Sequence, residues 1–564
     1  MIGSRRAASA LRFAGAVLSG LLLASCFAPL EWSAVAWFAL VPLILVARYS
    51  SPGSAFKLGL VCGVAFWTPA LVWLLVLAEK GVPAPIAYLV LLLLVGYGSL
   101  YIALFAMTVS RWFATWGTEN WRKNLGYTVA IPLLWVGIEF LRSHLVSGFP
   151  WNTIGVSQAF ATNQFSMSIC QLAEFGGGYA VSGMIVLLNA GLAMTIIRLR
   201  GVSVGQTYRM HPELTLSLVV VGAGVLCGAS VLGKYSISEA PNASITVVQP
   251  NIPQLEKWDD DFAQNIYSRL NDLTRRALSP GLDLIVWPET SVPFPIFWEE
   301  SVSFMAELLT NGVPILIGST DDRLMDQGIV YNSSALLEAA GRGLPSQIYN
   351  KQHLAPLGEY VPFSDLMPRL IAAVAPAGWI GLRAGTNTVV FRLKNRPELQ
   401  FASLICFEDA FPVLARNAVR AGARLLIDQT NDAWFDVSCG ARQHLSHCIF
   451  RCIENRVPAV RAANTGVSCF IDRAGRIRPD AILGQCEAGV LSISAFVPSV
   501  QMPLTFYTRH GDVVLAFPCA IFAVLSFVLA LTRRGRLGSM AMVAEESGGN
   551  IGRTPLPADL GKKG

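Results

Sequence analysis

Charged side chains are scarce in this sequence of 564 residues. Asp, Glu, Lys and Arg together make up 14% of the chain, and 53% is hydrophobic, with a mean hydropathy of +0.49. Soluble domains typically carry about 25% charged residues, so a chain that is soluble throughout is excluded. Histidine is also rare, with six in the whole chain, which leaves a serine–histidine hydrolase without an obvious base.

Long apolar segments, in contrast, are abundant. About 20 consecutive apolar residues are needed to cross the hydrocarbon core of a bilayer. We predict seven spans before residue 235 and one near the C-terminus, with 33–48 short for a span. The predicted spans are 8–27, 33–48, 56–78, 84–110, 126–145, 177–197, 214–233 and 511–531.

The positions of lysine and arginine predict how these spans are oriented. Basic residues precede the first span, lie in the even-numbered connections and follow the last span, whereas the odd-numbered connections hold little beyond Lys80. Because basic loops remain in the cytoplasm, we expect both termini to be cytoplasmic. We thus expect a multi-pass membrane protein whose long connection between the last two spans lies outside the cytoplasm, which is the periplasm if the membrane is a bacterial inner membrane.

Residues 235–510 differ in character from the rest of the chain and are predicted to form a separate periplasmic domain. They carry 23 Lys and Arg against 27 Asp and Glu, whereas the remainder carries 20 against 10. The basic excess therefore follows membrane topology and does not indicate a nucleic-acid partner. The expected domains are 1–234 (membrane helices), 235–510 (periplasmic), 511–532 (a C-terminal transmembrane helix) and 533–564 (a disordered cytoplasmic tail).

Short β-rich runs alternate with polar segments rich in Gly and Pro in the periplasmic domain, which is typical of an α/β fold. Three of these runs stop at a residue that can do chemistry. LDLIVWPET ends near Glu289, SQIYNKQH contains Lys351, and FASLIC ends at Cys406. Strand ends are where α/β folds keep reactive groups, so we expect an acid, a lysine and a cysteine around one substrate carbonyl.

The charges of these three residues indicate a role for each. A free cysteine with a pKa near 8.5 is only about 3% thiolate at pH 7, and Glu289 within hydrogen-bond reach could take the thiol proton of Cys406. A protonated Lys351 would hold the thiolate and then the oxyanion of a tetrahedral intermediate, a contact worth about 3–4 kcal/mol. Taken singly, each residue also has an ordinary structural explanation: a core cysteine, a turn glutamate or a solvent-facing lysine.

A zinc site on a helix is an alternative use of His444, His447, Cys448 and Cys452. Their spacing is loose for structural zinc, and the two cysteines are equally compatible with packed core positions. We therefore expect neither a metal nor another cofactor. Six cysteines lie in the periplasmic domain, and their spacing leaves disulfide pairing open.

Residues 245–495 resemble the nitrilase superfamily around Glu289, around Lys351, and at Cys406 with a glutamate two residues later. Seven spans before this domain and one after it make the layout similar to that of the apolipoprotein N-acyltransferase family, the membrane-embedded branch. Further matching stretches are SGFPW (147–151), VVQPNIPQLEKWD (247–259), LGEYVPF (357–363), NDAWF (431–435) and RAANTG (461–466). Family members often have glycine after NDAWF, where this chain has Asp436, and that departure bears on the conformation of the loop.

The resemblance implies a four-layer α-β-β-α sandwich that carries a Glu-Lys-Cys triad. It assigns Glu289 as the base, Lys351 as the cation that stabilises the oxyanion and Cys406 as the nucleophile. Glu359 and Glu408 would be supporting acids that position Lys351 and the loop of the thiol.

By the same resemblance the protein catalyses a two-step acyl transfer, the last step of lipoprotein maturation. A phospholipid donor, expected to be phosphatidylethanolamine, would give an acyl chain to Cys406 as a thioester. The α-amine of a diacylglyceryl-cysteine apolipoprotein would then attack the thioester and form an amide. Both substrates carry acyl chains in the outer leaflet, so membrane lipids are also partners and the thiol must lie close above that leaflet.

Two apolar segments of the periplasmic domain fit a position at the membrane. SVPFPIFW (291–298) follows the predicted base, and PRLIAAVAPAGWIGL (368–382) follows Glu359. Apolar surface beside a catalytic loop indicates contact with lipid, and Trp298 and Trp379 are candidate lipid-facing anchors. Ordinary core helices are the alternative explanation for these segments.

Three polar residues, Glu139, Arg142 and His144, lie near the end of the fifth predicted span. Such groups are costly at membrane depth unless they are functional or paired. A Glu139–Arg142 pair within the helix is the simpler alternative to a functional role.

Two other functions remain open from the sequence. A membrane-anchored amidase or nitrilase would use water as the acceptor, although a single helix would suffice to anchor it. A transporter with an exported binding domain is the alternative from another class, although the spans hold few charged residues that could line a path. The triad would then be unexplained.

Overall fold

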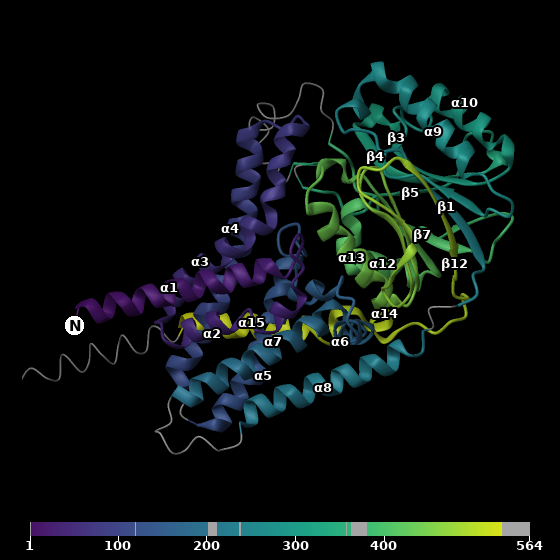
Figure 1. Cartoon of the computed structure of the whole chain (residues 1–564). Coiled ribbons are helices and arrows are strands. Elements are labelled where there is room, and N and C mark those ends of the chain that lie inside the picture. The colour runs from purple at the N-terminus through teal and green to yellow at the C-terminus, as the bar shows by residue number, and fades with distance from the viewer. Residues whose placement is uncertain are drawn as a thin grey trace, which may run out of the picture.

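The computed structural model describes residues 2–118, 120–200, 211–235, 239–356, 358–361 and 381–532. The chain forms a helical part and an α/β part that lie side by side (Figure 1). The α/β part is built from residues between helix α8 and helix α14, as the change in sequence character at 235–510 predicts.

Seven helices in the described part of the chain are long and apolar enough to cross a membrane. They are Arg6–Ser25, Pro52–Lys80, Ala84–Trp116, Trp121–His144, Ala173–Arg200, Pro212–Leu232 and Phe506–Leu531. The corresponding elements are α1 (Ile2–Ser25), α3 (Pro52–Leu71) with the 3₁₀ helix Val72–Lys80, α4 (Ala84–Trp116), α5 (Trp121–His144), α7 (Ala173–Arg200), α8 (Pro212–Leu232), and α14 (Phe506–His510) with α15 (Ala516–Thr532). The protein is therefore a multi-pass membrane protein.

The predicted span 33–48 is a shorter apolar helix, composed of the 3₁₀ helix Ser33–Trp37 and α2 (Val41–Arg48). Between these two pieces the backbone N–H of Leu40 donates to Asn189 Oδ1 at 2.9 Å. A helix of eight residues is about 12 Å long, well short of the hydrocarbon core. The eight predicted spans thus correspond to seven long helices and one short one that packs against them.

Three glycines, Gly176 to Gly178, lie near the start of α7, where the backbone at Gly176 and Gly177 is non-helical. Gly177 has φ +63°, and a Cβ added there would lie 2.8 Å from the ring of Tyr507 in α14. Only glycine meets both conditions. The backbone N–H of Gly178 donates to Glu454 Oε1 at 3.1 Å, so this break brings α7 against the α/β part.

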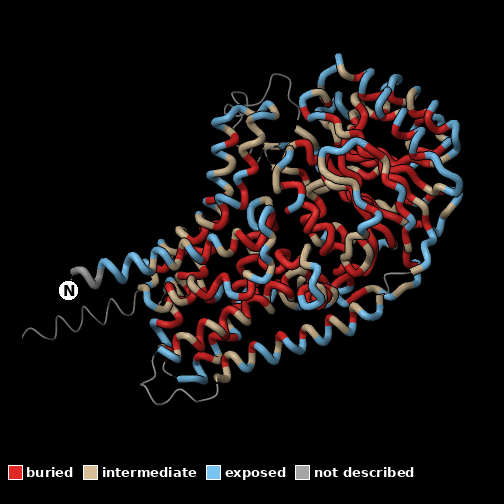
Figure 2. The backbone as a smooth tube through the Cα atoms, viewed as in Figure 1, coloured by how far each residue is buried: buried red, intermediate tan, exposed pale blue. Residues whose placement is uncertain are grey.

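The outer faces of the membrane helices carry large exposed apolar side chains. These include Leu21 on α1, Leu92 on α4, Leu226 on α8 and Leu529 on α15. Figure 2 shows exposed residues along the outer sides of α1 and α8, while the interior between helices is buried. Apolar surface of this extent is expected to face lipid.

The α/β part contains two six-stranded sheets, ordered β12-β1-β2-β3-β4-β5 and β11-β10-β9-β8-β7-β6. The first sheet has β1 (Ala243–Gln249), β2 (Leu284–Val286), β3 (Ile315–Leu324), β4 (Ile329–Leu337), β5 (Pro345–Asn350) and β12 (Gly489–Ala495). The second has β6 (Phe391–Arg392), β7 (Gln400–Ile405), β8 (Leu425–Thr430), β9 (Ala459–Ala463), β10 (Ser468–Ile471) and β11 (Ile477–Leu483). Strands β1 to β3 are parallel, as are β7 to β9.

The two sheets pack face to face with a helical layer on each outer side, which confirms the predicted α-β-β-α sandwich (Figure 1). The core between the sheets joins side chains such as Val247 of β1 to Phe401 of β7. Helices α9 (Ala263–Ala277) and α10 (Glu299–Leu308) cover the first sheet, and α12 (Pro412–Arg420) and α13 (Gly440–Asn455) cover the second.

Helix α13 lies between the second sheet and the membrane helices. All its residues except Arg442 are buried, and a helix that is buried all round needs packing partners on every side. Ile449 and Leu445 of α13 share one apolar core with Leu426 of β8 and with Ile185 of α7. The α/β part and the membrane part are therefore joined through a continuous core.

Candidate active site

The three residues predicted to form a triad follow three different strands. Glu289 comes shortly after β2, Lys351 directly after β5, and Cys406 directly after β7. β2 and β5 belong to the first sheet and β7 to the second, so the site lies where the ends of the two sheets face each other.

Lys351 lies between two carboxylates. Its Nζ is 3.3 Å from Glu289 Oε1 and 2.9 Å from Glu359 Oε1, and the residue is 1% exposed. Burial alone would lower the pKa of Lys351, but the charges of Glu289 and Glu359 raise that pKa well above its usual value. Lys351 is therefore expected to be protonated at neutral pH.

Glu289 is held in its ionised form by donors from both sheets. Asn332 Nδ2 donates to Oε1 at 2.7 Å, and the backbone N–H of Asn431, after β8, donates to Oε2 at 2.9 Å. Burial alone would raise the pKa of Glu289, but the charges of Lys351 and Lys257 and the bond from Asn332 bring it below its usual value. An ionised carboxylate is the form that can accept a proton.

Asn332 of β4 is a site residue that the sequence analysis missed. The same Nδ2 also donates to Glu359 Oε1 at 2.9 Å, so one amide holds both acids beside Lys351. Glu359 is fixed further by the backbone N–H of Ala355, which donates to Oε2 at 2.7 Å. An asparagine inside a β-rich run carries no sequence signal for such a role.

Cys406 is the first residue of the 3₁₀ helix Cys406–Ala410, which follows β7 directly, and it lies in a strained turn. Its φ is +53°, a left-handed conformation that non-glycine residues seldom adopt and that often marks functional turns. Burial, then the charge of Glu289, raise the pKa of the thiol well above its usual value, while Lys351 acts in the opposite direction. The resting thiol is therefore protonated and needs a base.

Glu408 connects the loop of Cys406 to the loop of Lys351. Its carboxylate accepts hydrogen bonds from Tyr349 Oη at 2.8 and 2.9 Å and from the backbone N–H groups of Gln352 at 2.6 Å, His353 at 3.1 Å and Ile405 at 2.8 Å. Glu408 does not contact the lysine ammonium itself. Its buried carboxylate therefore holds the two loops together through hydrogen bonds. Burial raises the pKa of Glu408 to about 7.

A cluster of buried charges lies behind the Cys406 turn and was not anticipated from the sequence. Arg461 of β9 is bonded to three aspartates: Asp409 at 3.2 Å, Asp432 at 3.0 Å and Asp428. His444 of α13 lies 3.1 Å from Asp409 and 3.0 Å from Asp432. Burial lowers the pKa of His444, but these aspartates raise it to about 10. Arg461 Nη2 also lies 2.9 Å from His444 Nδ1.

This cluster accounts for His444 without zinc. His447 instead has its ring centroid 5.0 Å from that of Trp151. In the described residues, the group whose possible ligand atoms approach within 4.8 Å of one another is Asp409, Asp428 and Cys448. Both of those carboxylates already bind Arg461, so this donor set is a poor fit for a cation.

All 11 cysteines are unpaired.

Gln443 of α13 joins the catalytic domain to the membrane part. Its Oε1 accepts from Trp151 Nε1 at 2.8 Å and from Trp73 Nε1 at 3.2 Å. Its Nε2 donates to the carbonyls of Ala28 at 3.0 Å and Ala70 at 3.2 Å. One amide thus binds three separate membrane segments, and Trp151 belongs to the SGFPW stretch identified in the sequence.

Arg142 and Glu139 of α5 have separate partners near the same stretch. Arg142 Nη1 donates to the carbonyls of Phe149 at 2.6 Å and Trp151 at 2.7 Å. Glu139 Oε1 accepts from Trp135 Nε1 at 2.9 Å and from the backbone N–H of Ile154 at 2.7 Å. These residues hold the 147–154 loop in place, and the alternative Glu139–Arg142 ion pair is not among the pairs formed by the described residues.

The two candidate lipid-facing tryptophans differ in what can be said of them. Trp298 is 46% exposed, its Nε1 donates to Asp322 at 2.7 Å, and its ring lies 5.8 Å from that of Phe294. Trp379 and most of the segment 368–382 lie outside the described residues. The exposure of Trp298 agrees with a surface position.

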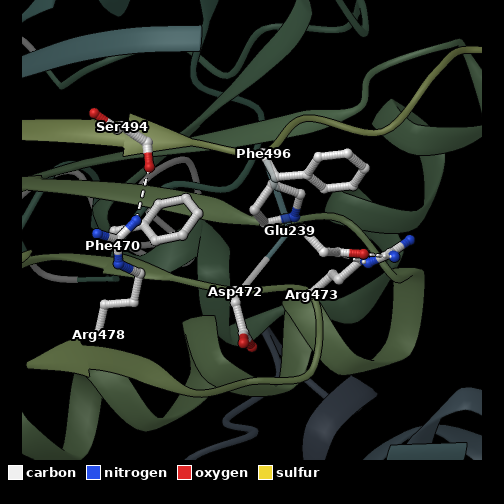
Figure 3. A pocket seen from close by; sticks show the side chains of 8 residues that line it. Glu239, Phe470, Asp472, Arg473, Arg478, Ser494 and Phe496 are labelled. Carbon is white, nitrogen blue, oxygen red and sulfur yellow. Dashed lines mark hydrogen bonds and ion pairs between the residues drawn. The ribbon is translucent and has the colours of Figure 1, made fainter. Parts of the chain in front are cut away.

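A small hollow lies elsewhere on the α/β part, away from the triad (Figure 3). It is lined by Glu239, Pro458, Phe470, Asp472, Arg473, Arg478, Ser494 and Phe496. Arg473 pairs with Glu239, and Arg478 Nη1 donates to the backbone carbonyl of Ser494 at 2.7 Å. Each of its charged groups thus already has a partner, and none of its residues contacts the lysine–carboxylate centre.

An α-β-β-α sandwich with a buried Glu-Lys pair and a strand-end cysteine defines a membrane-embedded protein of the nitrilase superfamily. The family model described as carbon-nitrogen hydrolase matches residues 244–495, and the one described as apolipoprotein N-acyltransferase N-terminal domain matches 19–191. The chain belongs to the apolipoprotein N-acyltransferase family.

Its similarity to curated relatives extends over nearly the whole chain. The apolipoprotein N-acyltransferase of Geobacter metallireducens is 35% identical over 532 residues, covering 92% of this chain and 95% of the relative. That of Chlorobaculum tepidum is 30% identical over 552 residues, covering 92% and 96%. Among solved structures, a cysteine-to-alanine variant of a nitrilase-superfamily amidase from Nesterenkonia AN1 aligns with 46% of this chain and 93% of its own, with 16% identity and a TM-score of 0.35.

Proposed function

We propose that this protein transfers a fatty acyl chain from a phospholipid to the N-terminal amine of a diacylglyceryl-cysteine apolipoprotein. The names of its relatives support N-acylation of lipoproteins. The observation that carries the proposal in this chain is the Lys351 ammonium held between Glu289 and Glu359, beside a cysteine in a strained strand-end turn. These parts supply a base, a cation and a nucleophile for acyl transfer.

The first half-reaction forms an acyl-enzyme. Glu289 takes the thiol proton of Cys406, and the sulfur attacks the ester carbonyl carbon of the phospholipid. The negative charge that develops on the carbonyl oxygen is stabilised by the ammonium of Lys351. The C–O bond then breaks, Glu289 returns its proton to the leaving glycerol oxygen, and a lysophospholipid departs from the Cys406 thioester.

The second half-reaction transfers the acyl chain to nitrogen. The neutral α-amine of the apolipoprotein attacks the thioester carbon, and Lys351 again stabilises the oxyanion. Glu289 accepts the proton that the amine loses and delivers it to the departing sulfur of Cys406. An amide and the free thiol result, and no cofactor is consumed.

The attachment to the membrane supports a lipid rather than a soluble substrate. Helix α13 is buried between the second sheet and the membrane helices, and Gln443 binds three membrane segments. With the charge distribution of the loops, this supports a catalytic domain on the periplasmic face of a bacterial inner membrane, with both termini in the cytoplasm. We propose phosphatidylethanolamine as the donor.

A transfer assay tests this proposal. Purified protein in mixed micelles would receive phosphatidylethanolamine with a labelled acyl chain and a synthetic diacylglyceryl-cysteine peptide, with Cys406→Ala as the control. Labelled N-acyl peptide formed only by the parent is expected. Labelled free fatty acid with unmodified peptide would make the protein a hydrolase, and no reaction of either kind would reopen the transporter hypothesis.

A further inference from the structure

A second lysine, Lys257, is buried at the same site. It follows β1 in the loop that leads to α9, is 2% exposed, and its Nζ donates to the backbone carbonyl of Glu289 at 2.9 Å. That partner is a neutral oxygen, whereas the Lys351 ammonium binds two carboxylates. A buried ammonium held by a single carbonyl is costly unless nearby negative charge compensates it.

The loop that carries Lys257 is fastened to the ends of the second sheet. Gln254 Oε1 accepts from Asn431 Nδ2 at 2.8 Å, and the backbone N–H of Ile252 donates to Asn464 Oδ1 at 2.9 Å. Asn431 is also the residue whose backbone N–H binds the Glu289 carboxylate. Lys257 is therefore placed by the same framework that places the base.

The charges at the site leave room for a second cation. Glu289 and Glu359 provide two negative charges, while Lys351 alone provides one positive charge. Burial lowers the pKa of Lys257 to about 8, with Glu289 and Cys406 opposing that shift, so most molecules carry the ammonium at pH 7. With Lys257 charged, two lysines balance two carboxylates before and after the thiol proton moves.

We propose that Lys257 is a second cation of the active site, which positions Glu289 through its backbone carbonyl and stabilises the thiolate of Cys406. This proposal rests on the proposed role of Cys406 as nucleophile. In the step concerned, the S–H bond of Cys406 breaks, its electron pair stays on sulfur, and the proton bonds to the Glu289 carboxylate. Lys257 acts on that step as a positioning residue and exchanges no proton in it.

The charged and titratable groups that face the site come from several elements. They are Lys257 after β1, Glu289 after β2, Lys351 after β5, Glu359 in the following loop, Cys406 after β7 and Asp432 after β8. Asp432 raises the pKa of the thiol, after burial and Glu289. Removing one of the two lysines should therefore leave the thiolate in a net negative surrounding.

The test is the pH dependence of alkylation at Cys406. Purified full-length protein, without lipid, would react with iodoacetamide between pH 7 and 9, and mass spectrometry of the Cys406 peptide would give the rate. We expect Lys257→Met and Lys257→Gln to raise the pKa of the Cys406 thiol. Each unit of that rise should slow alkylation about tenfold at a given pH. Lys257→Arg, which keeps the charge, should stay near the parent, as should Lys234→Met at an exposed lysine.

The outcomes distinguish an effect of the Lys257 charge from an effect on its hydrogen bond or on the fold. Parent-like rates for both Lys257→Met and Lys257→Gln, in proteins that retain their melting temperature, would overturn the proposal. A Lys257→Gln protein that reacts like the parent while Lys257→Met does not would assign the effect to the hydrogen bond with the Glu289 carbonyl, and would overturn the role of Lys257 as a cation. If Lys257→Met fails to fold, the comparison of Gln with Arg decides. Because alkylation uses no lipid or peptide, a parent that alkylates but never acylates would instead contradict the proposed function.

Discussion

Lys80 and Asp436 form an ion pair, with Nζ 2.6 Å from Oδ2. Lys80 ends the 3₁₀ helix Val72–Lys80 in the membrane part, and Asp436 lies in the loop that follows β8. Each residue is unusual in the sequence: Lys80 is a basic residue in a connection otherwise poor in them, and Asp436 stands where the family often has glycine. Asp436 has φ +48°, a conformation that glycine adopts freely. The ion pair offers this chain a compensating contact between its two parts.

Reversing the charge of either residue should lower the stability of the protein modestly, and reversing both charges should restore part of it. We expect Lys80→Asp or Asp436→Lys to destabilise the protein by about 0.3–1 kcal/mol, since both side chains are partly exposed. The double variant, which restores an ion pair in the opposite sense, should recover much of the loss. Melting temperatures of the four proteins at low and high salt measure this, and strictly additive effects would mean that the pair contributes nothing.

Removing the amide of Gln443 should loosen the catalytic domain from the membrane part. Gln443→Leu leaves the indole N–H groups of Trp73 and Trp151 without their acceptor in a buried place, at about 1–3 kcal/mol for each unsatisfied group. We expect a lower melting temperature and slower acyl transfer from phospholipid, with Cys406 still open to alkylation. Gln264→Leu, at an exposed position of α9, is the matched control. Equal losses in the two variants would contradict a special role for Gln443.

Stability should depend on pH through Glu408. Burial raises its folded-state pKa from the usual 4.5 to about 7, so the folded protein binds more protons than the unfolded chain between these values. Its contribution is then fully present below about pH 4.5 and is lost as the pH rises through 7. Glu408→Gln cannot ionise, so the variant should lack this pH-dependent part of the free energy of unfolding, which amounts to up to about 3 kcal/mol.

The comparison of melting temperatures at pH 5 and pH 8 checks this prediction. The melting temperature of Glu408→Gln relative to that of the parent should be higher at pH 8 than at pH 5. A difference that does not change with pH would mean that the hydrogen bonds from Tyr349 and Gln352 keep Glu408 ionised throughout.

Glu289→Gln should abolish turnover at neutral pH. The fold keeps Glu289 ionised with a lowered pKa, so the parent retains its base across the neutral range and loses it only as the pH falls below the usual range of a glutamate. At high pH the thiolate forms without a base, and formation of the acyl-enzyme by the variant should partly recover. A pH–rate profile of single-turnover acylation measures this. Flat inactivity up to pH 10, in a folded protein, would count against Glu289 as the base.

Much of the architecture could be predicted from the sequence because composition and periodicity report on it directly. Apolar length identified seven long membrane helices, and the β-rich runs ending at Glu289, Lys351 and Cys406 indicated strand ends that would meet. The segment 33–48 is apolar over nearly the length of a span, but the turn before α2 divides it. Hydropathy does not register such a turn.

The parts of the site that the sequence did not reveal depend on contacts between distant residues. Asn332 bonds two carboxylates that lie 43 and 27 positions away. Gln443 reaches partners some 300 to 400 positions away. The aspartates around Arg461 likewise meet only in three dimensions. Asn and Gln in particular carry no local pattern that separates a structural hub from a surface residue.

The most direct test of the account is mass spectrometry of the protein after incubation with phosphatidylethanolamine and no acceptor. The account predicts a fatty-acyl mass on the Cys406 peptide that hydroxylamine removes and that a diacylglyceryl-cysteine peptide discharges. It also predicts that Cys406→Ser and Lys351→Ala lack the adduct while remaining folded. Release of lysophospholipid and N-acylation of the peptide with no acyl group on Cys406, or by a Cys406→Ala protein, would contradict the central claim that this thiol carries the acyl chain.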